Sequence, residues 1–301
     1  MMMTGKKLRL LVVADSTDPV ALTESEALRP VAEKIDFVAI PAERTGLLSP
    51  LCNRLGIKRA VKKTVSFYGT GYDAVLSYGA AAPRRMAAAL SSSTAVTHVV
   101  REEFYSSVGC AVAPMGETSG HSTRDHALTF VSFDSSPTTV EMMVAMAVAR
   151  PGSKISWLTV DAMPHLHAAG LGIPANLTVR TVASIEEALA VGAVDWTVDF
   201  GGNLTPPFHS LCQSLAAGVP VVAVGKDGVD EVFDDECCVM LGESPAKEEF
   251  VRGLLPYIDS DIRSQRMREG AKARWRTDHN PETVARRLID EILDRLKNER
   301  S

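Results

Sequence analysis

The chain has 301 residues, which is enough for about two domains. Its hydrophobic fraction of 46% and its charged fraction of 23% are typical of a globular protein. The formal net charge of -5 argues against a dedicated nucleic-acid-binding protein, because such proteins usually carry a basic excess.

The five cysteines have no CxxC spacing, so we expect buried thiols in a reducing compartment. A redox site at the adjacent Cys237 and Cys238 is the alternative. The histidines and cysteines also lack the spacing of a metal site, and no metal is expected. The amino-terminal apolar run is too short for a signal peptide, and no stretch of about 18 apolar residues could span a membrane. A cytoplasmic location is therefore expected.

Apolar, β-branched runs alternate with helical segments along the first part of the chain. Strands are predicted at residues 8–14, 35–40, 72–79 and 93–100, and an alanine-rich helix is predicted at residues 80–90. This alternation predicts parallel βαβ units with helices on both faces of a sheet. A stretch rich in Gly, Ser and Thr at residues 109–125 then marks a domain boundary.

The same alternation restarts after the boundary. Strands are predicted at residues 126–133, 154–160, 176–182, 194–200 and 219–225. Helices are predicted at residues 138–150, 184–192, 208–218, 244–258 and 259–278. Ser184 is expected to cap its helix, with Glu187 completing a capping box. A terminal helix at residues 281–298 has one apolar stripe, made of Val284, Leu288, Ile289, Ile292 and Leu296.

These elements predict an α/β protein with two Rossmann-like, doubly wound domains. We place the first domain at residues 1–115, the second at residues 116–280 and a C-terminal helix at residues 281–301. Ligands in such sheets bind beyond the carboxyl ends of the strands, so the loops after strands are the candidate sites. The first strand ends in ADSTDP instead of GxGxxG, which argues against a nicotinamide-dependent dehydrogenase.

Six landmarks from about residue 73 onward follow the order of a known family. They are YDAVLSYGAAA, STAVTHVV, CAVAPMGET, HALTFVSFDSSPTTVEMMVAMA, VDWTVDFGG with TPPFHSLCQSLAAGVPVVAVGKDGVDEV, and ARWRTDHNPETVARRLIDEI. In this order the chain resembles the two-domain GT-B glycosyltransferases of the large retaining family, group 1, which use nucleotide-activated sugars. The N-terminal domain is short for that family.

The resemblance implies two domains that face a cleft, with an acceptor on the N-terminal side and a nucleotide-diphosphate sugar on the C-terminal side. It implies hexosyl transfer with retention, and it implies neither a metal nor another cofactor. The acceptor stays open among a glycan, a lipid, a protein and a nucleic-acid base. Domain closure over such a cleft excludes water and limits hydrolysis of the activated sugar.

The resemblance also assigns residues around the transferred sugar. His98 corresponds to a histidine that ends a strand and faces this sugar, and the alternative is a histidine that is satisfied by a backbone carbonyl. Thr205 and Gln213 fall on two positions that carry glutamates in the family, the first beside the transferred sugar and the second at the ribose. Gln213 can still bind a ribose hydroxyl. Thr205 cannot supply a carboxylate beside a developing oxocarbenium ion.

The diphosphate is expected at two helix starts, where backbone N–H groups and the helix dipole favour anions. The assigned residues are Ser135 and Ser136 in the stretch SFDSSPTT, together with Phe208, His209 and Ser210. This stretch holds no cation where the family has an arginine and a lysine, and Lys226 or His209 is the candidate replacement. The alternative for Ser136 is a plain helix cap, with Pro137 at the first helical position.

These departures leave two further functions open. One is a catalytically degenerate GT-B-like binding or scaffolding protein, which the missing cations and Thr205 favour. The other is an epimerase-like enzyme, because such enzymes share the architecture and the use of nucleotide-sugars.

A basic run on a predicted helix bears on location. It consists of Arg54, Lys58, Arg59, Lys62 and Lys63. Peripheral glycosyltransferases use such a helix on anionic membranes, so contact with the inner membrane face is one interpretation. A solvated basic face is the other.

Overall fold

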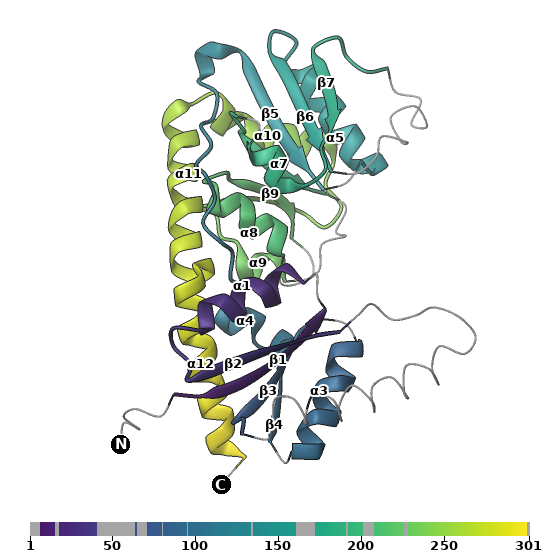
Figure 1. Cartoon of the computed structure of the whole chain (residues 1–301). Coiled ribbons are helices and arrows are strands. Elements are labelled where there is room, and N and C mark those ends of the chain that lie inside the picture. The colour runs from purple at the N-terminus through teal and green to yellow at the C-terminus, as the bar shows by residue number, and fades with distance from the viewer. Residues whose placement is uncertain are drawn as a thin grey trace, which may run out of the picture. The chain divides into compact units, whose positions relative to one another are not determined.

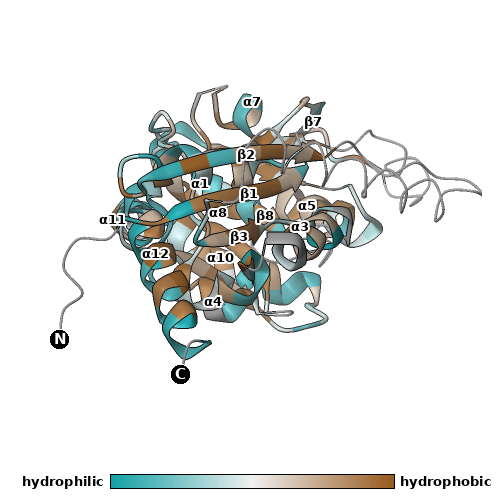
Figure 2. Ribbon diagram, turned by 60° about the horizontal axis from the view of Figure 1, so that its bottom comes forward, coloured by the Kyte–Doolittle hydropathy of each residue, from teal (hydrophilic) through white to brown (hydrophobic). Residues whose placement is uncertain are grey.

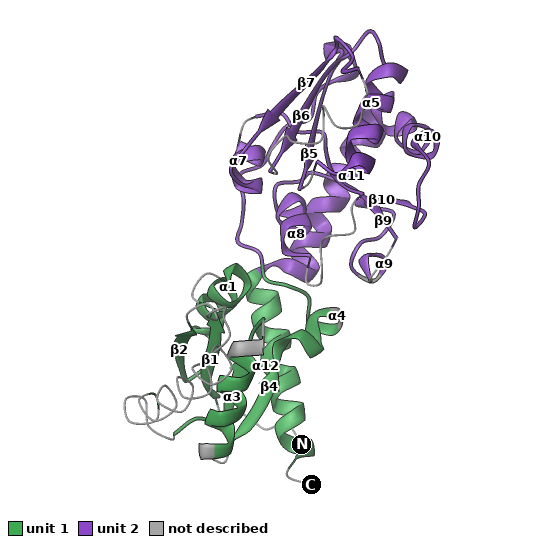
Figure 3. Cartoon of the chain, turned by 90° about the vertical axis from the view of Figure 1, so that its right-hand side faces the viewer, with its two compact units in different colours: residues 1–111, 281–301 green, residues 112–280 purple. Residues whose placement is uncertain are grey.

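The computed structural model describes residues 7–15, 18–40, 64, 71–79, 81–94, 96–133, 135–160, 172–190, 192–200, 208–225 and 228–299. The chain forms two compact units, which Figure 3 shows in green and purple. Unit 1 comprises Met1–Ala111 together with Pro281–Ser301, and unit 2 comprises Val112–Asn280. The sequence prediction ended the first domain at residue 115 and treated residues 281–301 as a separate helix. Among the described residues, no helix is long and apolar enough to cross a lipid bilayer.

Unit 1 contains a four-stranded parallel sheet in the order β2-β1-β3-β4. Its strands are β1 (Arg9–Asp15), β2 (Lys34–Ile40), β3 (Ala74–Ser77) and β4 (Thr97–Val100). Each of them lies within or beside a run that the sequence predicts as a strand. The middle of β1 is buried along five consecutive residues, as expected for a central strand with helices on both faces.

Helices cover both faces of this sheet (Figure 1). They are α1 (Pro19–Leu28), α3 (Ala81–Thr94), the 3-10 turn η1 (Arg101–Phe104), α4 (Tyr105–Val108) and α12 (Pro281–Asn298). Leu11 and Val13 of β1 share a buried cluster with Met86 and Leu90 of α3. Because side chains alternate along a strand, Leu10 points to the opposite face, where α1 packs on β1 and on α12.

The two helices α1 and α12 are specified differently in the sequence. Asp18 caps α1 by accepting hydrogen bonds from the backbone N–H groups of Val20 and Ala21, each at 3.0 Å. On α12 the predicted stripe is buried except at Ile289, which is only partly buried, whereas Ala285 is buried in addition. Figure 2 accordingly shows α12 in both hydrophobic and hydrophilic colours. Burial of this stripe attaches the C-terminal helix to unit 1.

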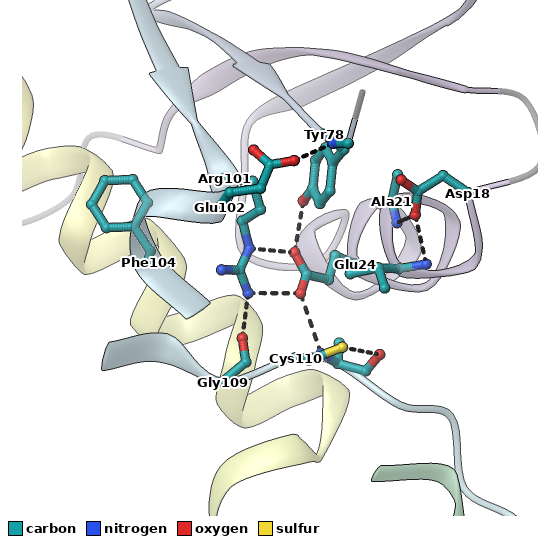
Figure 4. A network of polar contacts seen from close by, with 12 residues as sticks. Asp18, Ala21, Glu24, Tyr78, Arg101, Glu102, Phe104, Gly109 and Cys110 are labelled. Carbon is teal, nitrogen blue, oxygen red and sulfur yellow. Dashed lines mark hydrogen bonds and ion pairs between the residues drawn. The ribbon is translucent and has the colours of Figure 1, made fainter. Parts of the chain in front are cut away.

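A buried ion pair connects α1 to the segments that follow β3 and β4 (Figure 4). Arg101 donates to the two carboxylate oxygens of Glu24, from Nε at 2.7 Å and from Nη2 at 2.8 Å. The hydroxyl of Tyr78 donates to Glu24 at 2.8 Å, and the backbone N–H of Ala111 donates to it at 3.2 Å. All three side chains are fully buried. Burial, followed by the charge of Glu24, raises the pKa of Tyr78, so its hydroxyl keeps the proton that it donates.

Unit 2 contains a six-stranded parallel sheet in the order β10-β9-β8-β5-β6-β7. Its strands are β5 (Ala127–Ser132), β6 (Lys154–Thr159), β7 (Leu177–Thr181), β8 (Trp196–Asp199), β9 (Val221–Val224) and β10 (Cys238–Leu241). The first five were predicted from the sequence, and β10 was not. From β5 the chain first adds strands on one side of the sheet, and with β8 it changes to the other side. This is the strand order of a Rossmann fold.

Helices also cover both faces of the second sheet. They are α5 (Pro137–Ala149), α7 (Ile185–Ala190), α8 (His209–Ala216), α9 (Val229–Val232), α10 (Lys247–Ile258) and α11 (Asp261–Arg274), with the 3-10 turn η2 (Thr123–Asp125) and the π-helical segment η3 (Trp275–His279). Phe130 of β5 belongs to a core cluster with α5 and α10. Val131, the next residue, belongs to a cluster with α7. The alternation of one strand thus separates the two apolar layers.

The start of α7 shows a cap close to the predicted one. The hydroxyl of Ser184 accepts from the backbone N–H of Glu187 at 3.2 Å, as a capping box requires. The carboxylate of Glu187 accepts from the backbone N–H of Ala183 at 2.7 Å, one residue before the expected partner. Both contacts fix the helix start directly after β7.

Two close contacts in unit 2 join segments that are far apart in the sequence. The ring Nδ1 of His121 lies 2.7 Å from Oδ2 of Asp195, and the backbone N–H of His121 donates to Oδ1 at 2.8 Å. The hydrogen bond to Asp195 raises the pKa of His121. On α11, Gly270 lies so close to the backbone of Glu236 that an added Cβ would be 2.0 Å from the carbonyl oxygen. A side chain at position 270 would therefore require the two segments to separate.

Candidate functional site

The edge of the unit 2 sheet where the strands end is the candidate site. All its strands are parallel, so the carboxyl ends of β5 and β8 lie at the same edge. The connections after these two neighbouring strands leave in opposite directions, because β6 lies on one side of β5 and β9 on the other side of β8. Open α/β sheets bind ligands at such a switch point. The predicted residues 135–136 follow β5, and residues 208–213 follow β8.

Ser135 and Ser136 lie at the start of α5. Ser136 is the N-cap residue, and its hydroxyl accepts from the backbone N–H of Thr139 at 3.3 Å. Pro137 follows as the first helical residue. Ser135 is completely buried. The helix-cap interpretation of Ser136 is thus observed, and the first N–H groups of an α-helix have no acceptor within the helix.

Phe208 is placed by its backbone and by its ring. Its φ of 54° and ψ of 36° lie in the left-handed region, which costs a non-glycine residue about 1 kcal/mol or more. Its ring is buried and packs edge-on against Phe233, with the ring centroids 6.4 Å apart. Phe208 therefore anchors the turn before α8 in the core. Its apolar side chain provides no acceptor, so it cannot cap the first turn of α8 as Ser136 caps α5.

His209 and Ser210 form the first turn of α8, and both are partly exposed. Neither residue is acidic, so the partial positive charge at this helix start is not neutralised by its own first turn. Backbone N–H groups at such a position bind phosphate oxygens. The two helix starts, α5 and α8, lie after the two strands that flank the switch point.

Gln213 lies one turn further along α8 and is nearly buried. Its side-chain amide donates a hydrogen bond to Oε1 of Glu186, the second residue of α7. A carboxylate only accepts hydrogen bonds, so this contact fixes the amide nitrogen toward Glu186 and turns the amide oxygen away. Gln213 therefore presents an acceptor of fixed orientation.

Glu186 remains ionised in this arrangement. Its partial burial would raise its pKa, but hydrogen bonds from its own backbone N–H, from Ser184 and from Gln213 lower the pKa on balance. The side chain of His209 also lowers it. The cluster of Glu186, His209 and Gln213 thus places one carboxylate at the candidate site. Glu186 was not predicted from the sequence, although its position directly after β7 puts it at the same sheet edge.

His98 lies in unit 1, on β4. The family resemblance implied a histidine at the end of its strand, whereas β4 continues through Val99 and Val100, where the strand predicted at residues 93–100 also ends. Its Nε2 lies 2.9 Å from the hydroxyl of Ser77 on β3. Burial lowers the pKa of His98, and the neighbouring arginines lower it further, so its ring is neutral at physiological pH. Its observed partner is thus a hydroxyl, whereas the alternative interpretation gave it a backbone carbonyl.

Other predicted residues are outside the described part of the chain. These are Thr205, Lys226 and the basic run Arg54, Lys58, Arg59, Lys62 and Lys63. Among the described cysteines, Cys110, Cys212, Cys237 and Cys238 are free and buried. Burial raises the pKa of the Cys237 thiol to about 12 and also raises that of Cys238. Both thiols are protonated at neutral pH, which disfavours the redox alternative.

Comparison with known proteins finds one matching family model and solved structures of similar fold. Residues 207–290 match a family model described as glycosyl transferase-like. Sucrose-phosphate synthase from Thermosynechococcus elongatus matches with a TM-score of 0.63 at 12% identity, over 98% of this chain and 100% of that chain. A glycosyltransferase from Rickettsia africae ESF-5 matches with a TM-score of 0.61 at 10% identity, over 96% and 99%. No curated protein matches by sequence.

A third solved structure carries ligands. The Anabaena protein HepE, in complex with UDP and glucose, matches with a TM-score of 0.60 at 13% identity, over 95% of this chain and 100% of that chain. These matches extend over nearly the whole length of the chain, and both units contain the parallel, doubly wound sheets expected from the sequence. The chain therefore has the fold of the GT-B glycosyltransferases.

Proposed function

We propose that this chain transfers a hexosyl unit from a nucleotide-diphosphate sugar to an acceptor. The observation that carries the proposal is the switch point between β5 and β8, where two helix starts and the Glu186–Gln213 pair lie at one sheet edge. Retention of configuration at the transferred carbon is the outcome that the family resemblance implies. The acceptor is not assigned.

The first step of the proposed mechanism is binding of the diphosphate. Its oxygens accept hydrogen bonds from backbone N–H groups in the first turns of α5 and α8, and the helix dipoles favour its charge. The start of α8 is the better position, because the side chain of its N-cap residue, Phe208, accepts no hydrogen bond from the N–H groups of the first turn. This contact with the diphosphate uses backbone N–H groups and needs no cationic side chain from the described residues. We propose that Lys226, which lies outside them, adds a positive charge.

The second step is recognition of the ribose. The amide oxygen of Gln213 accepts from one ribose hydroxyl, and the ionised Glu186 accepts from a second. The family that the chain resembles has glutamates at two positions in this region, and this chain has Gln213 at one of them. In our proposal Glu186, which reaches the site from another helix, supplies the negative charge that Gln213 lacks.

The proposed first donor to test is a UDP-hexose. The HepE structures with UDP and with UDP-glucose support this choice, because their fold matches this chain. Calorimetric titration with UDP, GDP, ADP and UDP-glucose measures binding directly. Absence of binding by every nucleotide at millimolar concentration would overturn the proposed function. Binding without turnover in mixtures of acceptors would leave a binding protein in place of an enzyme.

The substitution Gln213→Ala tests the placement of the nucleotide. It removes one hydrogen bond, so the affinity for UDP should fall by about tenfold. Gln265→Ala is a matched control, because Gln265 also donates its amide to a glutamate, Glu269, at 3.1 Å, but on the exposed surface of α11. Equal UDP affinities of the two variants would show that the nucleotide does not contact Gln213.

A further inference from the structure

A polar pocket lies between the helices α10 and α11 and the turn that leads into β10, all within unit 2 (Figure 3). Its volume is about 340 Å³, which is enough for a small metabolite. The turn precedes β10, so the pocket is at the amino end of this strand, whereas the candidate site lies where the strands end. Six residues line the pocket: Asp235, Glu236, Tyr257, Arg263, Arg266 and Met267.

The acidic wall of the pocket is a turn with a fixed backbone. Oδ1 of Asp234 accepts from the backbone N–H of Glu236 at 3.1 Å, and Oδ2 of Asp234 lies 3.3 Å from Nη1 of Arg274 on α11. The carbonyl of Glu236 also packs against Gly270 of α11, where an added Cβ would be 2.0 Å from its oxygen. These contacts use Asp234 and the backbone, so the exposed side chains of Asp235 and Glu236 are left to line the pocket.

The basic wall of the pocket is one face of α11. Arg263 and Arg266 are three residues apart and are therefore neighbours on the same side of the helix. Met267, the next residue, is buried in the core of unit 2. Tyr257 comes from the end of α10, and its ring packs edge-on against the buried Trp196, with the ring centroids 5.8 Å apart. Both walls thus belong to elements that are fixed by the core or by hydrogen bonds, and such elements hold a binding geometry more precisely than free loops.

The charges that line the pocket are not used by the fold. In the described part of the chain, the side chains of Arg263 and Arg266 have no ion-pair or hydrogen-bond partner. The same holds there for the side chains of Asp235 and Glu236. Two positive and two negative groups therefore line one pocket and do not pair across it.

The balance of these charges distinguishes between classes of ligand. A simple anion is attracted by the two arginines but repelled by the two carboxylates, and a metal cation experiences the reverse. A nucleic acid or an anionic membrane attracts an excess of basic residues, which this pocket does not have. A molecule with both an anionic group and an ammonium group matches both walls, because guanidinium groups bind carboxylate or phosphate and carboxylates bind ammonium.

We propose that this pocket binds a small zwitterion. Its carboxylate or phosphate group is bound by Arg263 and Arg266, and its ammonium group is bound by Asp235 and Glu236. Free α-amino acids and phosphorylated amines are the classes of metabolite that carry these two groups. No residue of the pocket belongs to the candidate site, so the proposal is independent of the sugar-transfer activity.

Saturation-transfer NMR detects weak binding and tests the proposal with two probes. One probe is O-phosphoethanolamine and the other is a pool of the protein L-amino acids, each at about 10 mM, so that a dissociation constant in the millimolar range is detected. Binding of phosphoethanolamine alone would assign a phosphate group to the arginines, and binding of amino acids alone would assign a carboxylate group. Binding of neither probe would overturn the proposed site.

The substitution Arg266→Gln locates the bound probe. It removes a charge-assisted contact, so the dissociation constant should rise by about tenfold. Arg252→Gln is the matched control, because Arg252 is exposed on the neighbouring helix α10 but does not line the pocket. The control should leave the dissociation constant unchanged, and both variants should keep the circular dichroism of the wild type. Equal dissociation constants of the two variants would show that the probe binds elsewhere.

The double substitution Asp235→Asn with Glu236→Gln tests the charge reasoning. It keeps the arginines and removes both carboxylates, so the ammonium group loses its partners. The wild type should bind phosphoethanolamine more tightly than inorganic phosphate, or the amino acids more tightly than acetate, and the double variant should lose this preference. If the wild type binds the zwitterion and its simple anion equally, the pocket is an anion site and the proposed ligand class is overturned.

Discussion

The buried ion pair of unit 1 predicts a large loss of stability for Glu24→Gln. Each carboxylate oxygen of Glu24 accepts from two donors, one from Arg101 and the other from Tyr78 or Ala111. Glutamine keeps the shape but turns one of these oxygens into an NH₂ group, which then faces two donors. Arg101 also stays buried without a counter-charge. Removal of one partner from a buried ion pair costs about 3–5 kcal/mol, which is a large part of a total stability of about 5–15 kcal/mol.

Urea unfolding followed by circular dichroism measures this loss, with Glu26→Gln as the matched control. Glu26 lies on the same helix and forms an exposed ion pair with Arg29 at 3.1 Å, so its substitution should cost less than about 1 kcal/mol. The double substitution Glu24→Met with Arg101→Met removes both charges and should cost less than Glu24→Gln alone. If Glu24→Gln and Glu26→Gln differ by less than about 1 kcal/mol, the electrostatic reasoning is refuted.

Other positions give predictions of a different kind. Gly270→Ala should destabilise the protein by about 2 kcal/mol or more, because the added Cβ would clash with the backbone of Glu236. Gly253→Ala should stabilise the protein by about 0.5–1 kcal/mol, because the nearest neighbour of its added Cβ lies at 3.6 Å. Equal melting temperatures of the two variants would contradict this expectation. The hydrogen bond to Asp195 raises the pKa of His121. The contribution of this hydrogen bond to the free energy of unfolding is therefore fully present below about pH 6.5 and is lost as pH rises through the raised pKa. His121→Gln should remove this dependence, and a constant difference in unfolding free energy between pH 6 and pH 8 would speak against it. Sugar transfer should continue in the presence of EDTA, because the proposed mechanism uses no metal ion. If EDTA abolished turnover and Mg²⁺ restored it, the mechanism would have to include a metal ion.

The strands were predictable because most of them are buried on both faces. The sequences of β5 and β9 are short, nearly continuous apolar runs between turn residues, which is the pattern of a parallel sheet under two helical layers. The stripe of α12 was also predictable, because spacings of three and four residues identify its buried side. Even there, Ala285 is buried and Ile289 is not fully buried, since the orientation of the helix depends on its neighbours.

The candidate site was less accessible to sequence reasoning. Glu186 gains its role from Gln213, which lies 27 residues further along the chain. Only the parallel arrangement of β5, β7 and β8 in one sheet brings the starts of α5, α7 and α8 to the same edge. Such contacts follow from topology, which local patterns do not contain.

The return of the C-terminal helix to unit 1 has a consequence for synthesis of the chain. Unit 2 is a continuous segment that is inserted into unit 1, and the chain passes between the units at Ala111–Val112 and again at Asn280–Pro281. During translation, every residue of unit 2 is therefore made before α12 exists. The apolar surface of α1 that α12 covers stays open until Pro281–Asn298 have emerged. We infer that the first unit to begin is the last to be completed, so a nascent chain truncated before Pro281 can hold all of unit 2 but not the whole core of unit 1.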